Sequence, residues 1–469
     1  MDGSTEAGSG GETARSPRAP HGAETAHGAE IARSAGTARG AGPTGRPDAH
    51  TWLFGLLALL LLLIAGRGWD KALSERGNDL TIYLDSAQVA LEGGNPLLVP
   101  DSIYLPFFDC LLAPLALLPR AVFAGLWQVA SWACIVWGLV QFVRLADPER
   151  RRPWLLWVTT LLTLRLWDSN LSYGQANAFT FACLIASLRA LAADRERIAG
   201  AWIGFAAAFK VLPGLALLLL VARRSVRGTL TGLGVLIGLS LLVPPLFLGL
   251  RGSLEAHRTW VEEVSGPYLL GGDDLLEKRP YVAGQSLLAA AYRTLGNTPV
   301  TRSDLERRAS VAELEPDTVH AIARTLIALH LGAVGVVLWR RRRERGRAVV
   351  AETGALLMCT ALVCGPLIHK AHMSWSAVGF AVLALSLADA RGVGRLRAGV
   401  PLVLATALIG LSTPLFFGTE RVRDLVAVNG LTLGLEFLWI GVLSVAWSRR
   451  VGLSEPVGAI PGDGPGRAI

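Results

Sequence analysis

The chain has 469 residues, of which 52% are hydrophobic and only 17% are charged. A soluble domain would carry about a quarter charged residues, so this composition excludes an ordinary soluble globular enzyme. The apolar residues gather in runs of about 15–23, the length that crosses or nearly crosses a bilayer. The net charge of +8 comes mainly from Arg residues in many short loops. This pattern indicates membrane topology and contact with membrane lipids at the inner surface, and not binding to nucleic acid.

Both ends of the chain are predicted to be disordered cytoplasmic tails, residues 1–50 and 451–469. The first contains almost no large apolar side chain. A segment of this composition cannot bury enough apolar surface to offset the entropy lost on ordering. The Leu-rich stretch Trp52–Ala65 that comes next has no small-residue cleavage site, so we expect an uncleaved membrane anchor.

Between the tails, residues 51–450 contain the segments that we expect to enter the membrane. In chain order they are Thr51–Gly66, Tyr104–Leu118, Ala121–Val143, Trp154–Asn170, Ala176–Ala192, Ala199–Phe209, Pro213–Val221, Leu230–Leu250, Val319–Trp339, Val349–Ile368, Ser374–Leu387, Ala398–Pro414 and Ala427–Trp447. They predict an all-α polytopic membrane protein, a bundle of about 11–13 transmembrane or re-entrant helices.

The Arg residues predict which loops are cytoplasmic. The Arg-rich loops are 144–152, 195–197, 223–227, 340–347, 391–397 and 449–450. All of them fall on the side of the N-terminal tail if two segments do not cross. Tyr104–Leu118 must return to the side it came from, and Ala199–Val221 must form an up-and-down pair with Lys210 at its tip. In the rival path both segments cross, and loop 144–152 lies outside.

The preferred path places the polar clusters together on the extracytoplasmic face. These clusters are Asp79 with Tyr83, residues 167–177, Lys210, residues 255–263 with Gln285, and residues 369–372. Because the faces were assigned from Arg alone, this convergence predicts an outward-facing active site.

Asp79 stands after the first hydrophobic segment and before a predicted short surface helix, Leu80–Glu92. An Asp at this position is favoured as a helix N-cap. A carboxylate at the outer edge of the membrane can also act as a general base. Asp85 lies six residues further on, at roughly 600° of helical rotation, so it points elsewhere and is interpreted as solvated or structural.

Lys210 follows an apolar stretch and precedes Val211-Leu212-Pro213. A lysine within a membrane segment is costly and usually faces a partner or a cavity. We interpret it as a phosphate contact for an anionic lipid, with snorkelling to the interface as the alternative. Asp109 is a functional candidate by the same argument, unless a re-entrant path leaves it in contact with water.

Gln175 and Asn177 open a membrane helix on the same face. They either cap it and bond to neighbouring helices or offer polar groups to a substrate. His369 and His372 flank Lys370 and, three residues apart, share one side of a turn. No further ligands at metal-site spacing accompany them, so no metal is predicted. One His could assist Asp79 or bind a phosphate; the alternative is that both are plain interfacial residues.

The sequence has no Walker A loop, Rossmann fingerprint, Gly-x-Ser-x-Gly or His-Glu-x-x-His motif. An enzyme that uses a cytosolic nucleotide sugar needs a soluble binding domain, and we expect none here. We therefore expect no cofactor, and any group donor must arrive in the membrane or from outside.

Several segments, taken in order, resemble glycosyltransferase family 87, the polyprenyl-phosphate-mannose-dependent α-mannosyltransferases of actinobacteria. They are Asn78–Ala87, Glu92–Leu97, Tyr104–Phe107, Leu111–Pro114, Gly174–Asn177, Ala199–Pro213 and Gly284–Leu287. Each motif is weak alone, whereas their order and spacing together are fairly specific. The resemblance runs from about Thr51 to Arg450.

The resemblance implies a GT-C fold and a hexosyltransferase of the multi-pass plasma membrane, with its N-terminus cytoplasmic. It implies transfer of a sugar, most often mannose, from a polyprenyl-phosphate donor to a glycolipid or lipoglycan on the extracytoplasmic face. Asp79 would be the base toward the acceptor hydroxyl, and Lys210, with Arg165 or Lys370, would neutralise the leaving phosphate. The transfer would be metal-independent and inverting. Further substrate contacts are expected from Tyr83, Tyr104, Gln175, Asn177, Gln285, His369 and Lys370.

The chain departs from the family pattern at two places. The family often has Pro-x-Ser-Trp-x-His-His where this chain places His369 and His372, and we favour His372 as the partner of Asp79. Gly284 replaces the usual Asn, which is compatible with a different acceptor. Another polyprenyl-phosphate sugar, such as an arabinofuranosyl donor, is a close variant. A transporter or flippase of lipid-linked sugars is the alternative class, although the sequence shows no convincing internal repeat.

Overall fold

A computed structural model describes residues 49–73, 78–149, 151–266, 284–296, 299–301, 304–308, 310–412 and 420–448. The two predicted tails, apart from the last two residues of the first, lie outside the described residues. The chain divides into two units, Met1–Leu56 and Leu57–Ile469, and the second contains the helical bundle. The described residues are nearly all helical, with one short antiparallel pair, β1 (Pro299–Thr301) and β2 (Asp304–Arg308). This confirms the predicted all-α polytopic class.

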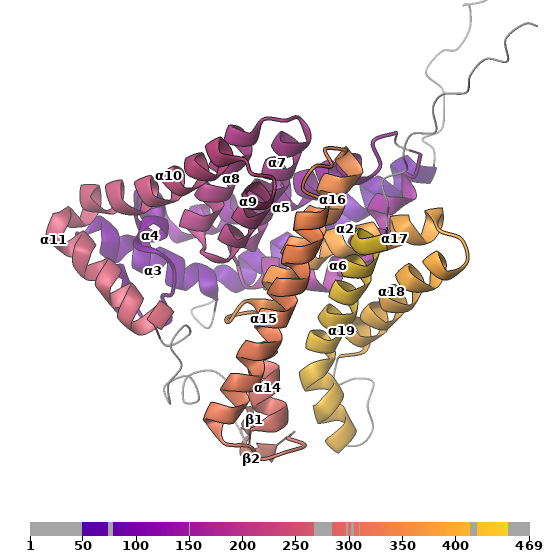
Figure 1. The fold of residues 1–469 in the computed structure, drawn as a ribbon. Helices are drawn as coiled ribbons and strands as arrows, with labels where there is room; N and C mark the ends of the chain where they lie inside the picture. Colours follow the sequence, from indigo (N-terminus) through magenta and orange to yellow (C-terminus); the bar gives the residue numbers. More distant parts are fainter. Residues whose placement is uncertain are drawn as a thin grey trace, which may run out of the picture. The chain divides into compact units, whose positions relative to one another are not determined.

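The elements succeed one another along the chain as coloured in Figure 1. Up to residue 266 they are α2 (Ala49–Leu73), α3 (Asp79–Leu91), η1 (Pro96–Leu98), α4 (Pro106–Leu112), η2 (Ala113–Leu117), α5 (Arg120–Ala146), α6 (Trp154–Ser172), α7 (Asn177–Ala192), α8 (Glu196–Phe209), η3 (Leu212–Ala216), α9 (Leu217–Ala222), α10 (Val226–Leu242), α11 (Pro244–Thr259) and η4 (Trp260–Ser265). After it come α14 (Leu287–Leu295), β1, β2, α15 (Pro316–Arg340), α16 (Arg347–Cys364), η5 (His372–Ser376), α17 (Ala377–Asp389), α18 (Val393–Leu411) and α19 (Glu420–Ser448).

Several helices are long and apolar enough to cross a membrane. Among the described residues, five pass this test by length and composition, and a sixth is added if the bent pair α10 and α11 counts as one span. Three other apolar stretches are shorter, namely Pro106–Leu117, Asn177–Ala192 and Leu212–Ala222. The predicted mixture of full spans and short segments is therefore present.

The two segments with an ambiguous path are both broken. In the first, α4 has only seven residues and passes into the 3₁₀ turn η2, so it is about 10 Å long and cannot cross. In the second, α8 ends at Phe209 and Lys210 adopts an extended backbone, with φ −157° and ψ 125°. The short η3 then begins at Leu212, with Pro213 in its first turn, and packs back against α8. Both breaks agree with the preferred path.

The sequence predicted Leu230–Leu250 as a single segment, and this prediction is wrong. α10 ends at Leu242 and α11 begins at Pro244, with a bend of 78° between the two helices. Pro244 has no backbone N–H to continue the helix, but proline is well tolerated in the first turn of a new one. The chain therefore leaves the direction of α10 and runs across the end of the bundle, as Figure 1 shows.

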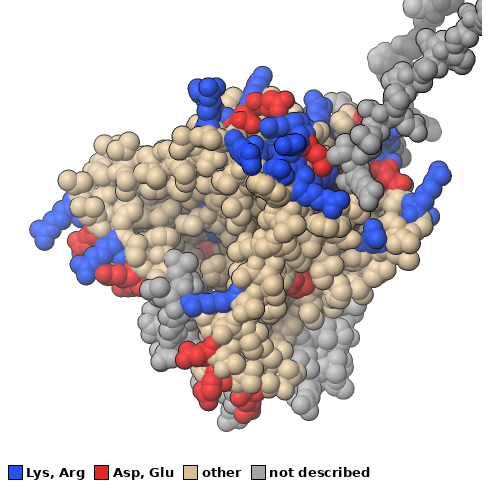
Figure 2. Space-filling model, viewed as in Figure 1, with Lys and Arg blue, Asp and Glu red and all other residues tan. Residues whose placement is uncertain are grey.

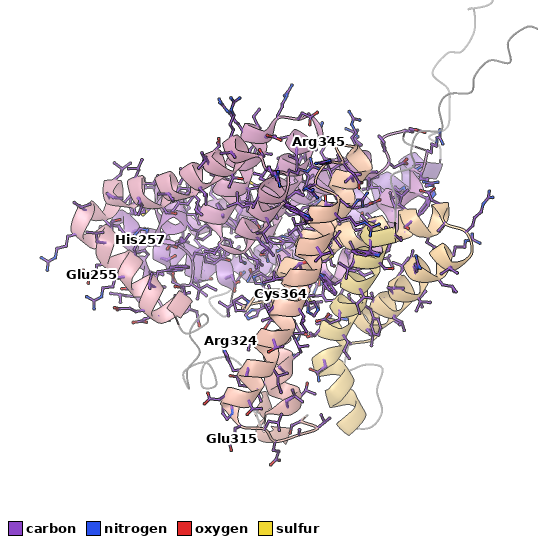
Figure 3. All side chains as sticks on the ribbon, in the orientation of Figure 1. Glu255, His257, Glu315, Arg324, Arg345 and Cys364 are labelled. Atoms are coloured by element: carbon purple, nitrogen blue, oxygen red, sulfur yellow. The ribbon has the colours of Figure 1, made fainter. Side chains whose placement is uncertain are left out.

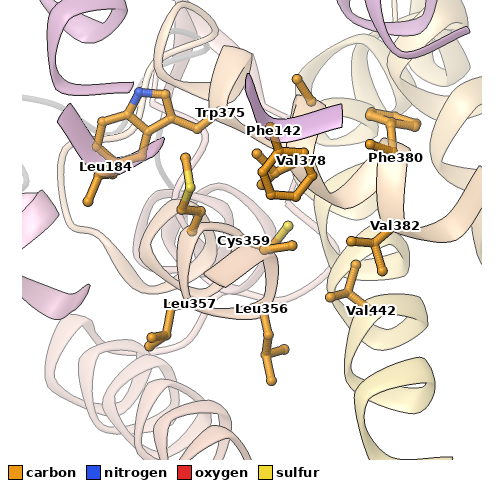
Figure 4. Packing of buried hydrophobic residues seen from close by; sticks show 14 of the residues in the cluster. Phe142, Leu184, Leu356, Leu357, Cys359, Trp375, Val378, Phe380, Val382 and Val442 are labelled. Atoms are coloured by element: carbon orange, nitrogen blue, oxygen red, sulfur yellow. The ribbon is translucent and has the colours of Figure 1, made fainter. Parts of the chain in front are cut away.

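The core surrounds α16 and α17, whose side chains are buried almost throughout. Figure 4 shows Cys359 of α16 near Val378 of α17, and Val382 of α17 beside Val442 of α19. Trp375, at the edge of this cluster near Leu184, is completely buried. Since water is excluded here, the elements that carry Trp375 are held by apolar packing.

The Arg-rich loops meet at one end of the bundle. Arg345 pairs with Glu196 at 3.1 Å, and Arg223 donates to the carbonyl of Glu344 at 3.3 Å. Arg152 forms an ion pair with Asp389, Arg189 bonds to Gln141, and Arg341 donates to the carbonyl of Ala446 at 3.3 Å. Figure 2 shows the resulting concentration of positive charge, and Figure 3 labels Arg345 there, with Glu315 and Arg324 at the opposite end. Loop 144–152 therefore shares this end, and the rival path is wrong.

Candidate active site

The start of α3 is fixed by the turn between α6 and α7. The side chain of Asn78 caps α3 by accepting a bond from the Leu80 N–H, so Asp79 is the first helical residue and not the N-cap. The Asp79 N–H donates to the carbonyl of Tyr173 over 3.1 Å. Gly174 has φ +65°, and a Cβ there would lie 2.7 Å from the Leu80 Cβ. The turn therefore needs glycine, both for its left-handed backbone and for its close approach to α3.

Two buried tyrosines pair beside the start of α3: Tyr83, one turn further along α3, and Tyr104, in the segment before α4. The Tyr83 hydroxyl is 2.7 Å from the Tyr104 hydroxyl, and their rings meet edge to face at 5.1 Å. Phe108 of α4 packs against both rings. Buried hydroxyls need partners, and these two satisfy one another while presenting Tyr104 toward Lys210.

Lys210 is the centre of the polar cluster. Its Nζ lies 2.9 Å from Asn177 Oδ1, 3.4 Å from the Tyr104 hydroxyl and 2.6 Å from His372 Nε2. Lys210 stands at the tip between α8 and η3, outside the membrane-spanning helices, and is only partly exposed. Burial lowers the pKa of Lys210 to about 7, and the negative charge of Asp79 opposes this shift. Lys210 therefore has three polar partners.

Asn177 is oriented by its neighbours. Its Nδ2 donates to Gln175 Oε1 over 3.3 Å, which turns Oδ1 toward Lys210. Its backbone carbonyl accepts a 3.0 Å bond from the Trp375 indole. The Gln175–Asn177 element therefore opens α7, as predicted, and also faces the cluster.

His372 begins η5 and is buried. Its Nδ1 accepts a 3.1 Å bond from the backbone N–H of His369. Burial, with the neighbouring Lys210 and His369, lowers the pKa of His372 well below its ordinary value. Of the two candidate histidines, His372 is the one whose ring reaches Lys210.

Two carboxylates lie on the α3 side of the cluster. Asp79 is partly exposed, and its charge acts on Lys210, Tyr83 and Tyr104. Asp109 is 1% exposed and accepts a 2.7 Å bond from the Ser86 hydroxyl. The alternative in which Asp109 is simply in contact with water is therefore wrong.

Three other predicted contacts lie outside the Lys210 cluster. Arg165 donates to the carbonyl and hydroxyl of Ser412 at 3.0 and 3.2 Å, which satisfies the C-terminal end of α18. Lys370 is half-buried and interacts with Arg165 and Asp168. Gln285 is buried, and its Oε1 accepts a 3.1 Å bond from the Thr432 hydroxyl.

A cavity of about 300 Å³ opens beside Lys210, and Tyr104, Trp260 and His372 also line it. Six of its lining residues continue into a groove of about 660 Å³ between α10, α15 and α16. The groove walls are apolar, and Cys364, labelled in Figure 3, is among them. Sequence reasoning missed Trp260, whose indole donates to the carbonyl of Ile103 at 3.2 Å. Its sequence signal was its place in residues 255–263, one of the polar clusters predicted on the extracytoplasmic face.

Comparisons with known proteins identify the family of the chain. The family model of glycosyltransferase family 87 matches residues 103–366, which include Tyr104, Asn177 and Lys210 but neither Asp79 nor His372. The chain is also 29% identical over 184 residues to a polyprenol-phosphate-mannose-dependent alpha-(1-2)-phosphatidylinositol pentamannoside mannosyltransferase of Mycolicibacterium smegmatis. That alignment covers 36% of this chain and 44% of the relative, so the chain spans less than half of the relative's length. No solved structure matches. Because the family model covers more than half of its residues, the chain belongs to glycosyltransferase family 87.

Proposed function

We propose that this membrane glycosyltransferase moves mannose from a polyprenyl-phosphate donor to a glycolipid or lipoglycan acceptor on the extracytoplasmic face. The observation that carries the proposal is the position of Lys210, at the junction of a polar cluster and an apolar groove. A donor with a phosphate between a sugar and a long hydrocarbon chain fits that junction. The curated relative is named for such a donor.

The groove supports a lipid-linked donor on physical grounds. Nearly all of the residues that line the groove are apolar. The groove shares Val211, Leu212 and Pro366 with the cavity beside Lys210. A polyprenyl chain seated there would bury apolar surface at roughly 25 cal/mol per Å². The phosphate would then lie near Lys210, and the sugar would project toward α3.

In the proposed reaction Asp79 is the general base. Its carboxylate takes the proton of the acceptor hydroxyl while that oxygen forms a bond to the anomeric carbon. The bond between the anomeric carbon and the phosphate oxygen breaks on the opposite face, so the configuration inverts, and polyprenyl phosphate leaves with the electron pair. Negative charge grows on the phosphate as this bond breaks, which is where a cation stabilises the transition state more than the ground state.

Lys210 and His372 are the groups best placed for that charge. Arg165 is committed to the end of α18, so it is a weaker candidate than the sequence suggested. Lys370 is still a candidate for a second phosphate contact. Tyr104, Asn177 and Gln175 position Lys210, while Tyr83 supports Tyr104. Gln285 and His369 would act through the segments that they hold.

The test is sugar transfer in liposomes that contain the purified protein, radiolabelled polyprenyl-phosphate mannose and a membrane glycolipid extract. We expect label in glycolipid with wild type and none with Asp79→Asn, although donor binding is retained. The matched control is Asp85→Asn, the same change on an exposed residue of the same helix, which should transfer at the wild-type rate.

Each other outcome identifies a different error. Equal transfer by wild type and Asp79→Asn would remove Asp79 as the base. Movement of the donor across the bilayer without a new glycosidic bond would favour a flippase. No transfer and no movement would remove this donor.

A further inference from the structure

The hydrogen bonds around His372 fix its tautomer. A neutral imidazole carries one N–H, and the other ring nitrogen accepts. Because Nδ1 accepts the backbone N–H of His369 at 3.1 Å, the ring proton must reside on Nε2. An imidazole with its proton on Nδ1 would point two hydrogens at each other across that contact. His372 therefore presents Nε2–H to Lys210 Nζ at 2.6 Å.

This tautomer determines the charge of Lys210. An ammonium has three N–H donors and cannot accept a hydrogen bond, whereas a neutral amine has two donors and one lone pair. Asn177 Oδ1 and the Tyr104 hydroxyl are available as acceptors at 2.9 and 3.4 Å, and Asn177 cannot present its amide nitrogen because Nδ2 is bonded to Gln175. Two donors and one lone pair match these three contacts.

In the part of the chain that the structure describes, few other charged and titratable groups lie around Lys210. Asp79 and Tyr83 face it from α3, Tyr104 from the segment before α4, and His372, with His369 behind it, from η5. Asp79 favours the ammonium, while burial disfavours it and has the larger effect, since the pKa of Lys210 falls to about 7. An empty site that holds a neutral amine avoids the cost of a desolvated cation.

We propose that Lys210 is a neutral amine in the empty site and that binding of a lipid-linked phosphodiester is coupled to the uptake of one proton by its Nζ. The inference rests on the donor site of the proposed function. A proton from solvent adds to the nitrogen lone pair, which releases His372 Nε2–H. The ammonium and the imidazole N–H then both donate to phosphate oxygens. The site acquires its cation only when the anion that needs it is present.

The proton count of binding tests this directly. A short-chain polyprenyl-phosphate mannose is the probe, because a phosphodiester keeps a single negative charge through the neutral range and contributes no proton of its own. Its binding heat is measured by titration calorimetry at pH 8 in buffers with different ionisation enthalpies. With the pKa of Lys210 lowered, we expect the wild type to take up most of one proton for each ligand bound.

Lys210→Arg is the matched variant, because a guanidinium is charged throughout this range and has no proton to gain. It should bind the probe with no dependence of the heat on the buffer. Wild-type binding without buffer dependence would overturn the coupling and leave the donor assignment intact. Equal uptake by wild type and Lys210→Arg would place the proton elsewhere and overturn the role of Lys210. If the wild type does not bind the probe at all, the proposed donor fails and the coupling fails with it.

Discussion

The indole Nε1 of Trp375 donates a 3.0 Å hydrogen bond to the backbone carbonyl of Asn177, 198 residues away in the chain. Trp375 lies in η5 with His372, and Asn177 is the first residue of α7. The bond therefore sets the separation of two partners of Lys210. Since Trp375 is anchored in the apolar core, rigid packing fixes the geometry of the site.

Replacing Trp375 with Phe should lower kcat/KM for transfer about three- to tenfold, because one buried hydrogen bond contributes roughly 1 kcal/mol. The measurement is initial transfer rate against donor concentration, together with the melting temperature of the purified protein. Trp137→Phe is the control, because Trp137 is 40% exposed on α5. Equal losses in the two variants would mean that the Asn177 bond has no role in positioning.

Asn177→Asp should weaken donor binding at least tenfold. The new carboxylate would lie about 3 Å from Lys210 and compete with the phosphate for its N–H groups. Direct binding of a short-chain polyprenyl-phosphate mannose measures the effect. Asn95→Asp is the matched control, since Asn95 caps η1 and Asp caps equally well. An unchanged donor Kd in Asn177→Asp would exclude Lys210 as the phosphate contact.

Donor affinity should fall as the pH rises through neutrality. The pKa of Lys210 in the empty site is lowered to about 7, and a bound phosphate must raise it. Below pH 7 the amine is already protonated, so the donor Kd should be nearly constant there. Above pH 7 each bound donor requires a proton, so the Kd should rise up to tenfold for each pH unit.

Donor Kd measured between pH 6 and 9 gives this profile, and Lys210→Arg should flatten it. A wild-type Kd that is constant over the range, or that falls with increasing pH, would contradict the expected sign.

Some of the residues that meet around Lys210 were predicted from the sequence because polar side chains are costly in a membrane. A lysine between Phe209 and Val211 must have polar partners, and a break in the helix was expected from Lys210 and Pro213. The positive charge of the loops then predicted that these partners share one face. The contacts Arg345–Glu196 and Arg223–Glu344 show that these loops lie at one end of the bundle.

Sequence patterns could not supply the pairings that need three-dimensional geometry. Arg165 and Lys210 are both cations among apolar residues, yet Arg165 satisfies the carbonyls at the end of α18. Nothing local distinguishes the two. The bend at Pro244 was missed because a hydropathy run does not register a change of direction. Trp260 was missed because a single tryptophan has no periodic pattern that marks it as part of a site.

Helices α8 and α10 cross at glycines, which lets their backbones touch. A Cβ added at Gly200 would lie 2.0 Å from the Gly228 carbonyl oxygen, and one at Gly204 would lie 2.2 Å from the Gly232 oxygen. Two small residues four apart on each helix are a common means of close packing between membrane helices. Because α8 ends directly before Lys210, this crossing also fixes the position of Lys210 along the axis of α8.

Gly204→Ala should therefore lower the free energy of unfolding by about 1–3 kcal/mol, since the methyl group has no space and the helices must separate. Gly234→Ala, on α10 with nothing within 4 Å of the added Cβ, should leave stability unchanged or slightly higher. Thermal unfolding in detergent compares the two. If the crossing sets the position of Lys210, Gly204→Ala will also raise the donor Kd while Gly234→Ala will not. If Gly204→Ala is destabilised but keeps wild-type donor affinity, α8 moves without displacing Lys210. Contacts with η3 and His372 would then hold Lys210 more strongly than the helix crossing does.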